Sequence, residues 1–168
     1  MAMVKVKFCG LKQVDDVRWA NVLRPDYVGF VFAGKKRRIS FVEAEELRHT
    51  LDDRIPAIGV FVDATMAYIE KAVRAAHLSM IQLHGHEDDA YIEALTSLVR
   101  LPVIKAFSIE DETDIVRANK SKATYVLVDH GSGGTGETFE WAHLRKMKRP
   151  YFLAGGLTIE NVQSALAL

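Results

Sequence analysis

The sequence alternates between short strand-like runs and helical segments, and this alternation limits the chain to a parallel α/β architecture. Seven runs rich in β-branched or aromatic residues recur about every 24.5 residues, with helical periodicity between them. The runs are Val4–Phe8, Asp26–Phe32, Pro56–Val62, Met80–Leu83, Pro102–Ala106, Thr124–Asp129 and Tyr151–Ala154. Strands separated by single helices pair in parallel through crossover connections. We therefore expect a parallel sheet covered by helices.

Two helix starts can be read from the sequence. Ser40 precedes Phe41–Leu51, and Glu43 follows it at the spacing of a capping box. Within this segment, Val42, Leu47 and Leu51 are expected to form the apolar face. Thr158 is expected to begin the last helix.

Two folds share this rhythm, an open doubly wound sheet and a closed (βα)₈ TIM barrel. A doubly wound sheet usually carries a glycine-rich nucleotide turn after its first strand, whereas this chain continues as Phe8-Cys9-Gly10-Leu11. Polar or reactive residues instead follow several strands, namely Cys9, Arg37, His84 and Asp129. Loops that converge on one face of a barrel would bring such residues together. The TIM barrel is the favoured fold.

The expected domain organisation is one barrel domain over residues 1–168, in which seven βα units can be counted. At the observed spacing, an eighth strand would begin at about residue 175, beyond Leu168. We therefore expect the given chain to lack the eighth βα unit.

Charge and composition exclude several classes of protein. The 22 basic residues balance 22 acidic ones, so no global field favours nucleic acid or an anionic membrane. The apolar runs are far shorter than the roughly 20 residues that span a bilayer, and the N-terminus lacks the apolar core of a signal peptide. The only cysteine, Cys9, excludes an internal disulfide and suits a reducing cytoplasm. The expected location is cytoplasmic.

Cys9 ends a strand whose alternation places Lys5, Lys7 and Cys9 on one face. A nearby ammonium makes a thiolate available as a base or nucleophile. The alternative interpretation is a small buried apolar residue. Two lysines on the inward face favour function, because buried amines need partners or a task.

Two glycine-rich segments are candidate ligand loops. Asp129 ends an apolar strand and leads into a loop with Gly131, Gly133, Gly134 and Gly136, so it is a candidate general acid beside an anion-binding loop. The alternative is an ordinary connecting loop with a capping aspartate. Gly155-Gly156 precedes a helix start, a recurrent phosphate site after the seventh strand of such barrels, although tight βα turns also use glycine.

The remaining polar clusters are less specific. Lys35–Arg38 is either a solvated loop or a source of one arginine for a substrate carboxylate. Gln82 leads into His84 and His86, yet no third residue stands at a recognised metal-ligand spacing, so a metal site is not expected. Ser132 lacks a nucleophile elbow, which disfavours a serine hydrolase.

Taken in order, these motifs cover almost the whole chain. They are Lys7-Phe8-Cys9-Gly10, Gly29–Phe32 with Lys36–Ser40, Gly59–Val62, Gln82-Leu83-His84-Gly85, Asp129 with Gly133–Gly136 and Phe139, and Ala154–Leu157 with Asn161-Val162. Together they resemble the phosphoribosylanthranilate isomerase family, the (βα)₈ barrels of tryptophan biosynthesis. The chain departs from that family at its end, where the family continues into an eighth strand and a glycine-containing loop.

The resemblance implies an Amadori rearrangement of N-(5-phosphoribosyl)anthranilate, a small phosphorylated substrate, with no metal or redox cofactor. It implies Cys9 as the base and Asp129 as the acid, with Arg37 on the anthranilate carboxylate and Arg38 as its competitor. The other implied substrate-binding residues are Lys7, Gln82, His84, Gly133, Gly134, Gly136, Gly155 and Gly156. The expected assembly is a monomer or homodimer, with neither nucleic acid nor membrane as a partner.

Two alternatives stay open. A different phosphosugar isomerase on the same barrel, such as an aldose–ketose isomerase of histidine synthesis, would be expected to carry Asp in place of Cys9. A non-catalytic remnant that binds a phosphate ligand or a second copy of itself is favoured by the expected lack of an eighth unit.

Overall fold

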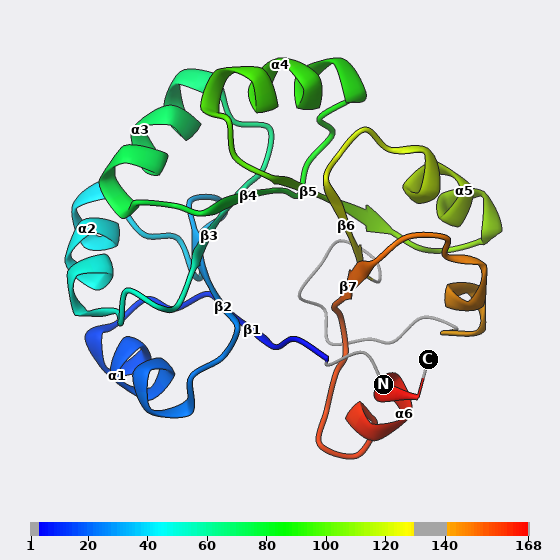
Figure 1. Ribbon diagram of the computed structural model, residues 1–168, viewed down its shortest axis with the longest axis horizontal. Helices are drawn as coiled ribbons and strands as arrows, with labels where there is room; N and C mark the ends of the chain where they lie inside the picture. Colours follow the sequence, from blue (N-terminus) through cyan, green and yellow to red (C-terminus); the bar gives the residue numbers. More distant parts are fainter. Residues whose placement is uncertain (1–3, 130–140, 168) are drawn as a thin grey trace. The chain divides into compact units, whose positions relative to one another are not determined.

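The structure, a computed structural model, describes residues 4–129 and 141–167, and Figure 1 shows strands alternating with helices throughout. The chain divides into two units, Met1–Val103 and Ile104–Leu168, which are described separately below. That residues 1–168 form a single domain stays a prediction. Among the described residues, no helix has the length and apolarity that crossing a membrane requires.

The first unit consists of parallel strands that alternate with helices. Its elements are β1 (Lys7–Cys9), α1 (Val14–Leu23), β2 (Tyr27–Val31), α2 (Phe41–Thr50), β3 (Ala57–Phe61), α3 (Met66–Ala76), β4 (Met80–Leu83) and α4 (Asp89–Val99). β1 pairs with β2, β2 with β3, and β3 with β4, all in parallel. Every residue of β3 is buried, as expected of a parallel strand covered on both faces.

The second unit repeats the pattern with less regular helices. Its elements are β5 (Val103–Ser108), α5 (Glu112–Lys120), β6 (Tyr125–Asp129), the 3₁₀-helix η1 (Trp141–Lys146), β7 (Tyr151–Leu153) and α6 (Val162–Leu166). β6 pairs in parallel with β5 and with β7. Ile109, Ile115, Val128 and Leu144 form the buried cluster between its strands and helices.

The expected α/β fold with parallel strands is confirmed, and each of the seven predicted strand segments overlaps an observed strand. Met80–Leu83 has the predicted bounds, while the other strands differ from prediction by a few residues at their ends. The largest shift is at β1, which begins at Lys7 instead of Val4 and includes Cys9. A strand ends where its ladder partners end, and the composition of one strand alone does not specify that point.

The start of α2 is as predicted, but one residue of its apolar face is not. Ser40 N donates to Glu43 Oε2 at 2.6 Å and Glu43 N donates to Ser40 Oγ at 3.2 Å, which is the capping box. Val42, however, is 65% exposed, and Ala44 and Leu47 are the buried residues of the helix. Residues three apart share a helix face, so Ala44 joins Leu47 while Val42 turns toward solvent.

The last helix begins later than predicted. Thr158 N donates to Asn161 Oδ1 at 2.8 Å, and Asn161 N donates to Thr158 Oγ1 at 3.3 Å. These reciprocal bonds close a turn over residues 158–161, and α6 starts at Val162. Local side-chain bonds of Thr and Asn compete with helical hydrogen bonding, which explains the delay.

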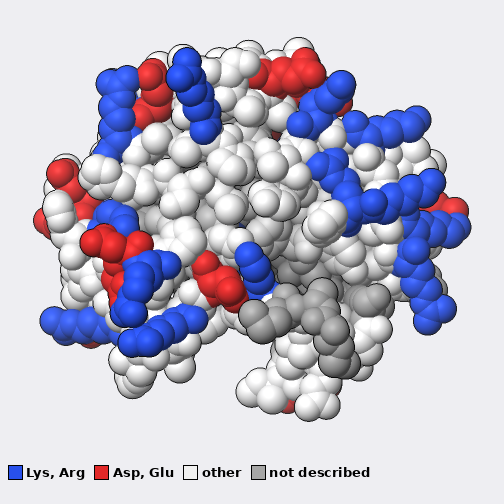
Figure 2. Space-filling model, viewed as in Figure 1, with Lys and Arg blue, Asp and Glu red and all other residues white. Residues whose placement is uncertain are grey.

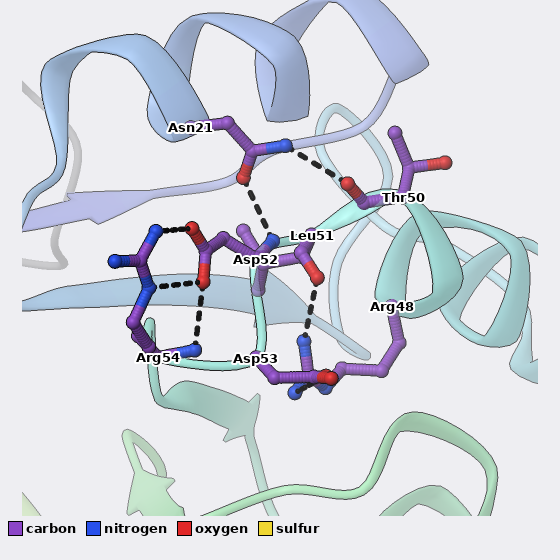
Figure 3. Close-up of polar contacts among 7 residues, drawn as sticks. All are labelled: Asn21, Arg48, Thr50, Leu51, Asp52, Asp53 and Arg54. Carbon is purple, nitrogen blue, oxygen red and sulfur yellow. Dashed lines mark hydrogen bonds and ion pairs between the residues drawn. The ribbon is translucent and has the colours of Figure 1, made fainter.

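The connection after α2 is fixed to α1 by one amide side chain (Figure 3). Asn21 Nδ2 donates to the Thr50 carbonyl at 2.9 Å, and Asn21 Oδ1 accepts from Asp52 N at 2.8 Å. Arg54 Nε donates to Asp52 Oδ1 at 2.9 Å and holds the pKa of that carboxyl well below its usual range. This network orders the approach to β3.

Candidate active site

Cys9 and Lys7 lie together on the inward face of β1. Cys9 is the last residue of β1 and is aligned with Gly29 of β2. A Cβ atom added to Gly29 would lie 2.7 Å from Cys9 Sγ and 3.1 Å from Lys7 Cε. The two side chains therefore cover the same residue of β2, and the glycine provides the room that they occupy. For Lys7 and Cys9, the face predicted from alternation is the observed one. Lys5 lies before β1 and is exposed, so its predicted place on the inward face of the strand is not observed.

The ammonium of Lys7 is held in an environment that opposes its charge. Burial lowers the pKa of Lys7 from its ordinary value, and the charge of Arg37 lowers it further. The charge of Cys9 and a hydrogen bond to Cys9 act in the opposite direction and raise the pKa of Lys7. The charged form of Cys9 therefore favours the ammonium form of Lys7, although burial outweighs this effect. A cysteine can remove a proton only as a thiolate.

Arg37 lies across the turn that follows Cys9. Its Nη1 donates to the Cys9 carbonyl at 3.4 Å. Gly10 in that turn has φ +92°, and a Cβ atom there would lie 2.5 Å from Arg37 Cδ. Only glycine combines this backbone conformation with so close an approach. The structure therefore brings Arg37 beside Cys9.

Arg38 points elsewhere. Its Nη2 lies 3.5 Å from the Tyr68 hydroxyl, and its backbone forms a single bridge with Val31 of β2. The two arginines that are alternative candidates for the carboxylate therefore have different neighbours. Of the two, Arg37 is the one that contacts the Cys9 segment.

Gln82 and His84 complete a polar chain that begins at Lys7. Gln82 lies on β4, is 3% exposed, and accepts a hydrogen bond from Lys7 Nζ through Oε1. Its Nε2 lies 3.2 Å from His84 Nδ1. The predicted residues Lys7, Cys9, Arg37, Gln82 and His84 are thus brought together within the first unit.

His86 lies in a separate cluster. Its Nδ1 lies 3.0 Å from Asp63 Oδ2, and Asp63 N donates to Glu87 Oε1 at 2.8 Å. In the part of the chain that the structure describes, no group of three or more His, Cys, Asp or Glu side chains is placed to hold a metal ion.

In the second unit, Asp129 and the Gly155-Gly156 turn are described. Asp129 ends β6 and is 4% exposed. Alternation along β6 directs it away from the apolar cluster that contains Val128. Gly155 and Gly156 have φ of +84° and +60°, and Asn161 Nδ2 donates to the Gly156 carbonyl at 2.8 Å. Gly133, Gly134 and Gly136 lie outside the described residues.

A buried lysine was not predicted. Lys105 on β5 is 6% exposed, among the apolar residues Val103, Ile104 and Ala106. Buried amines are rare unless they have partners, so a lysine within an apolar strand is the signal by which it can be found.

Comparisons with known proteins give one consistent result. The family model described as N-(5'-phosphoribosyl)anthranilate (PRA) isomerase matches residues 6–168. The N-(5'-phosphoribosyl)anthranilate isomerase of Endomicrobium trichonymphae is 40% identical over 168 residues, covering 98% of this chain and 82% of that protein. The corresponding protein of Clostridium kluyveri is 37% identical over 165 residues, covering 97% and 81%.

Solved structures agree with the sequence relatives. The crystal structure of phosphoribosylanthranilate isomerase from Thermus thermophilus matches with a TM-score of 0.89 at 32% identity, covering 98% of this chain and 82% of that one. A second structure is a phosphoribosylanthranilate isomerase in complex with reduced 1-(o-carboxyphenylamino)-1-deoxyribulose 5-phosphate. It matches with a TM-score of 0.83 at 31% identity, and the match covers 98% of this chain and 82% of that one. Since the family model and the relatives span nearly all of this chain, the chain belongs to the N-(5'-phosphoribosyl)anthranilate isomerase family.

Proposed function

We propose that this chain is an isomerase that converts N-(5-phosphoribosyl)anthranilate into 1-(2-carboxyphenylamino)-1-deoxyribulose 5-phosphate in tryptophan biosynthesis. The observation that carries the proposal is the family match over residues 6–168. The grouping of Cys9, Lys7 and Arg37 at the end of β1 supports it from the structure. Substrate and product are isomers, so the reaction needs no external oxidant or reductant.

The chemistry requires one acid and one base. Asp129 delivers a proton to the furanose ring oxygen, which breaks the C1–O bond and leaves an iminium at C1. The iminium acidifies the proton on C2, and the Cys9 thiolate removes it to give an enolamine. Protonation at C1 and loss of the hydroxyl proton at C2 then give the ketone. These two roles are proposals, supported by the burial of Asp129 and by the Lys7 ammonium beside Cys9.

The substrate offers two anionic groups to bind. For the anthranilate carboxylate we propose Arg37, whose guanidinium lies beside the Cys9 carbonyl. For the phosphate we propose the turn at Gly155-Gly156, whose left-handed backbone lets N–H groups approach an anion, together with Gly133, Gly134 and Gly136. From the first unit, we propose that His84 and Lys7 also contact the substrate.

Substituting the two arginines separately tests the carboxylate assignment. Arg37→Ala should lower kcat/KM by an amount that corresponds to a loss of roughly 2–4 kcal/mol of transition-state stabilisation, because a charge-assisted bidentate contact is lost. Arg38→Ala is the matched control, because that side chain lies toward Tyr68, and it should leave kcat/KM within about threefold. Steady-state kinetics of both variants decide the matter, and equal, small losses would show that another group holds the carboxylate.

A turnover assay tests the function as a whole. The anthranilate substrate is fluorescent, so its conversion can be followed as a loss of fluorescence on addition of the purified chain. Turnover that saturates with substrate supports the isomerase. Phosphate binding without turnover would favour the phosphate-binding alternative, and turnover of a different aldose-type phosphosugar alone would favour the other barrel isomerases.

The finer architecture that we propose is a (βα)₈ barrel completed by an eighth βα unit. Apolar side chains are exposed on β1's N-terminal approach and on α1, with Val6 48%, Trp19 65% and Val22 70% exposed. Uncovered strand edges and apolar faces are costly, and closure of a barrel removes its edges. Figure 2 shows that both basic and acidic side chains are exposed on the face in view.

Appending an eighth unit should therefore stabilise the chain. Fusion of about 35 residues from a family member, one βα unit with its tail, should raise both the melting temperature and kcat of the 168-residue chain. A scrambled extension of equal composition is the control. An unchanged melting temperature with the native extension would contradict this architecture. Sedimentation of both forms tests the proposed monomer or homodimer.

A further inference from the structure

The side-chain amide of Gln82 joins two strands that are not neighbours. Gln82 on β4 is aligned with Val60 of β3, and Val60 with Val31 of β2, while Lys7 lies on β1. Its contact with Lys7 Nζ therefore spans the inner face of the first unit. Two side chains separated by two intervening strands meet only where the sheet curls inward. The amide is 3% exposed, so water does not replace either of its partners at low cost.

The partners fix which way the amide points. An ammonium has three donors and no acceptor, so Lys7 must face the amide oxygen of Gln82. The amide nitrogen then faces His84 Nδ1 at 3.2 Å and can only donate. Nδ1 accepts that bond only when it carries no proton. A neutral His84 ring in this arrangement therefore carries its proton on Nε2.

We propose that Gln82 is a positioning residue that holds the Lys7 ammonium beside the Cys9 sulfur and fixes His84 as a neutral ring protonated on Nε2. Gln82 acts through Lys7 and His84 and itself supplies no proton to the reaction. Lys7 needs such an acceptor because burial and the charge of Arg37 both oppose its ammonium form. Lys5, which precedes β1, donates to the Tyr27 hydroxyl at 3.4 Å instead.

This inference rests on the proposed role of Cys9 as the base, so its test must not depend on turnover. Cys9 is the only cysteine of the chain and its side chain is exposed, so iodoacetamide reports its thiolate directly. The rate of alkylation is measured against pH, and the midpoint of the profile is compared between variants. A chain without isomerase activity would still give this midpoint, which keeps the two proposals separable.

Gln82→Met keeps the length of the side chain and removes both polar contacts. We expect the midpoint of Cys9 alkylation to rise by about 0.5–1 pH unit, because an unanchored Lys7 stabilises the thiolate less well. We also expect kcat to fall by more than about fivefold and KM to change less than kcat. A profile that superimposes on that of the parent would overturn the proposal.

The matched control is Asn21→Leu, which removes the other bridging amide described above, between α1 and the chain after α2. It should lower the melting temperature, yet leave the alkylation midpoint where it is in the parent. If Asn21→Leu shifted the midpoint as far as Gln82→Met does, the effect would be one of general stability and the proposal would fail.

Gln82→Glu provides a second test in a side chain of the same size that still accepts from Lys7. A carboxylate cannot donate to His84, so Nδ1 of that ring should gain a proton in order to donate to it. The ¹⁵N shifts of His84, compared with those of the parent, report which ring nitrogen is protonated. An identical pattern in parent and Gln82→Glu would show that the amide does not set the state of His84.

Discussion

Cys9→Ser should lower kcat by at least about a hundredfold while leaving the fold intact, since this is the lower range for loss of a general base. A serine hydroxyl has nearly the shape of the thiol, so the space above Gly29 stays filled. Its proton is held far more tightly at neutral pH, so the Lys7 ammonium no longer yields an anion that can remove the C2 proton. The measurement is kcat of both proteins with the fluorescent substrate.

Alkylation gives an independent control for this prediction. In the parent, product or a reduced product analogue should protect Cys9 from iodoacetamide if the thiol lies in the substrate site. Thermal melting curves of parent and Cys9→Ser should agree within a few degrees, because the exchange is nearly isosteric. Activity of Cys9→Ser within roughly tenfold of the parent, well short of the range for a general base, would remove Cys9 from this role.

The strands and the inward face of β1 can be predicted from sequence, because both depend on burial and backbone geometry. Parallel strands covered on both faces are mostly apolar, which marks them in the sequence. Alternation is fixed by backbone geometry, so Lys7 and Cys9 had to share a face. Strand ends depend on partners, and for this reason β1 differs most from its predicted bounds.

Contacts between distant segments could not be predicted in this way. Periodicity ends where a strand ends, so it does not indicate which of Arg37 and Arg38 turns toward Cys9; that follows from the glycine turn at Gly10. The bond between Lys7 and Gln82 joins residues 75 apart and depends on the curvature of the sheet. Sequence patterns specify faces, whereas contacts across a sheet depend on how the strands are assembled.

Asp129→Asn should reduce kcat about as severely as Cys9→Ser, by about a hundredfold or more. The amide has the size of the carboxyl group but no proton of useful acidity, so the furanose C–O bond loses its proton donor. Asp53→Asn is the matched control. The Asp53 side chain is 99% exposed and forms an ion pair with Arg48, so its substitution should not affect turnover. A full rate in Asp129→Asn would assign the protonation to another group, with His84 and His130 the next to substitute.

Combining the two substitutions tests whether the acid and the base serve consecutive steps of one reaction. The C2 proton becomes acidic only after ring opening has produced the iminium, so the thiolate of Cys9 has nothing to act on until Asp129 has delivered its proton. Residues that act as such a unit have strongly non-additive effects on kcat. Cys9→Ser combined with Asp129→Asn should therefore be little slower than the slower single variant. Losses that multiply, measured as kcat of the parent, both single variants and the double variant, would instead show two independent contributions and contradict this order of steps.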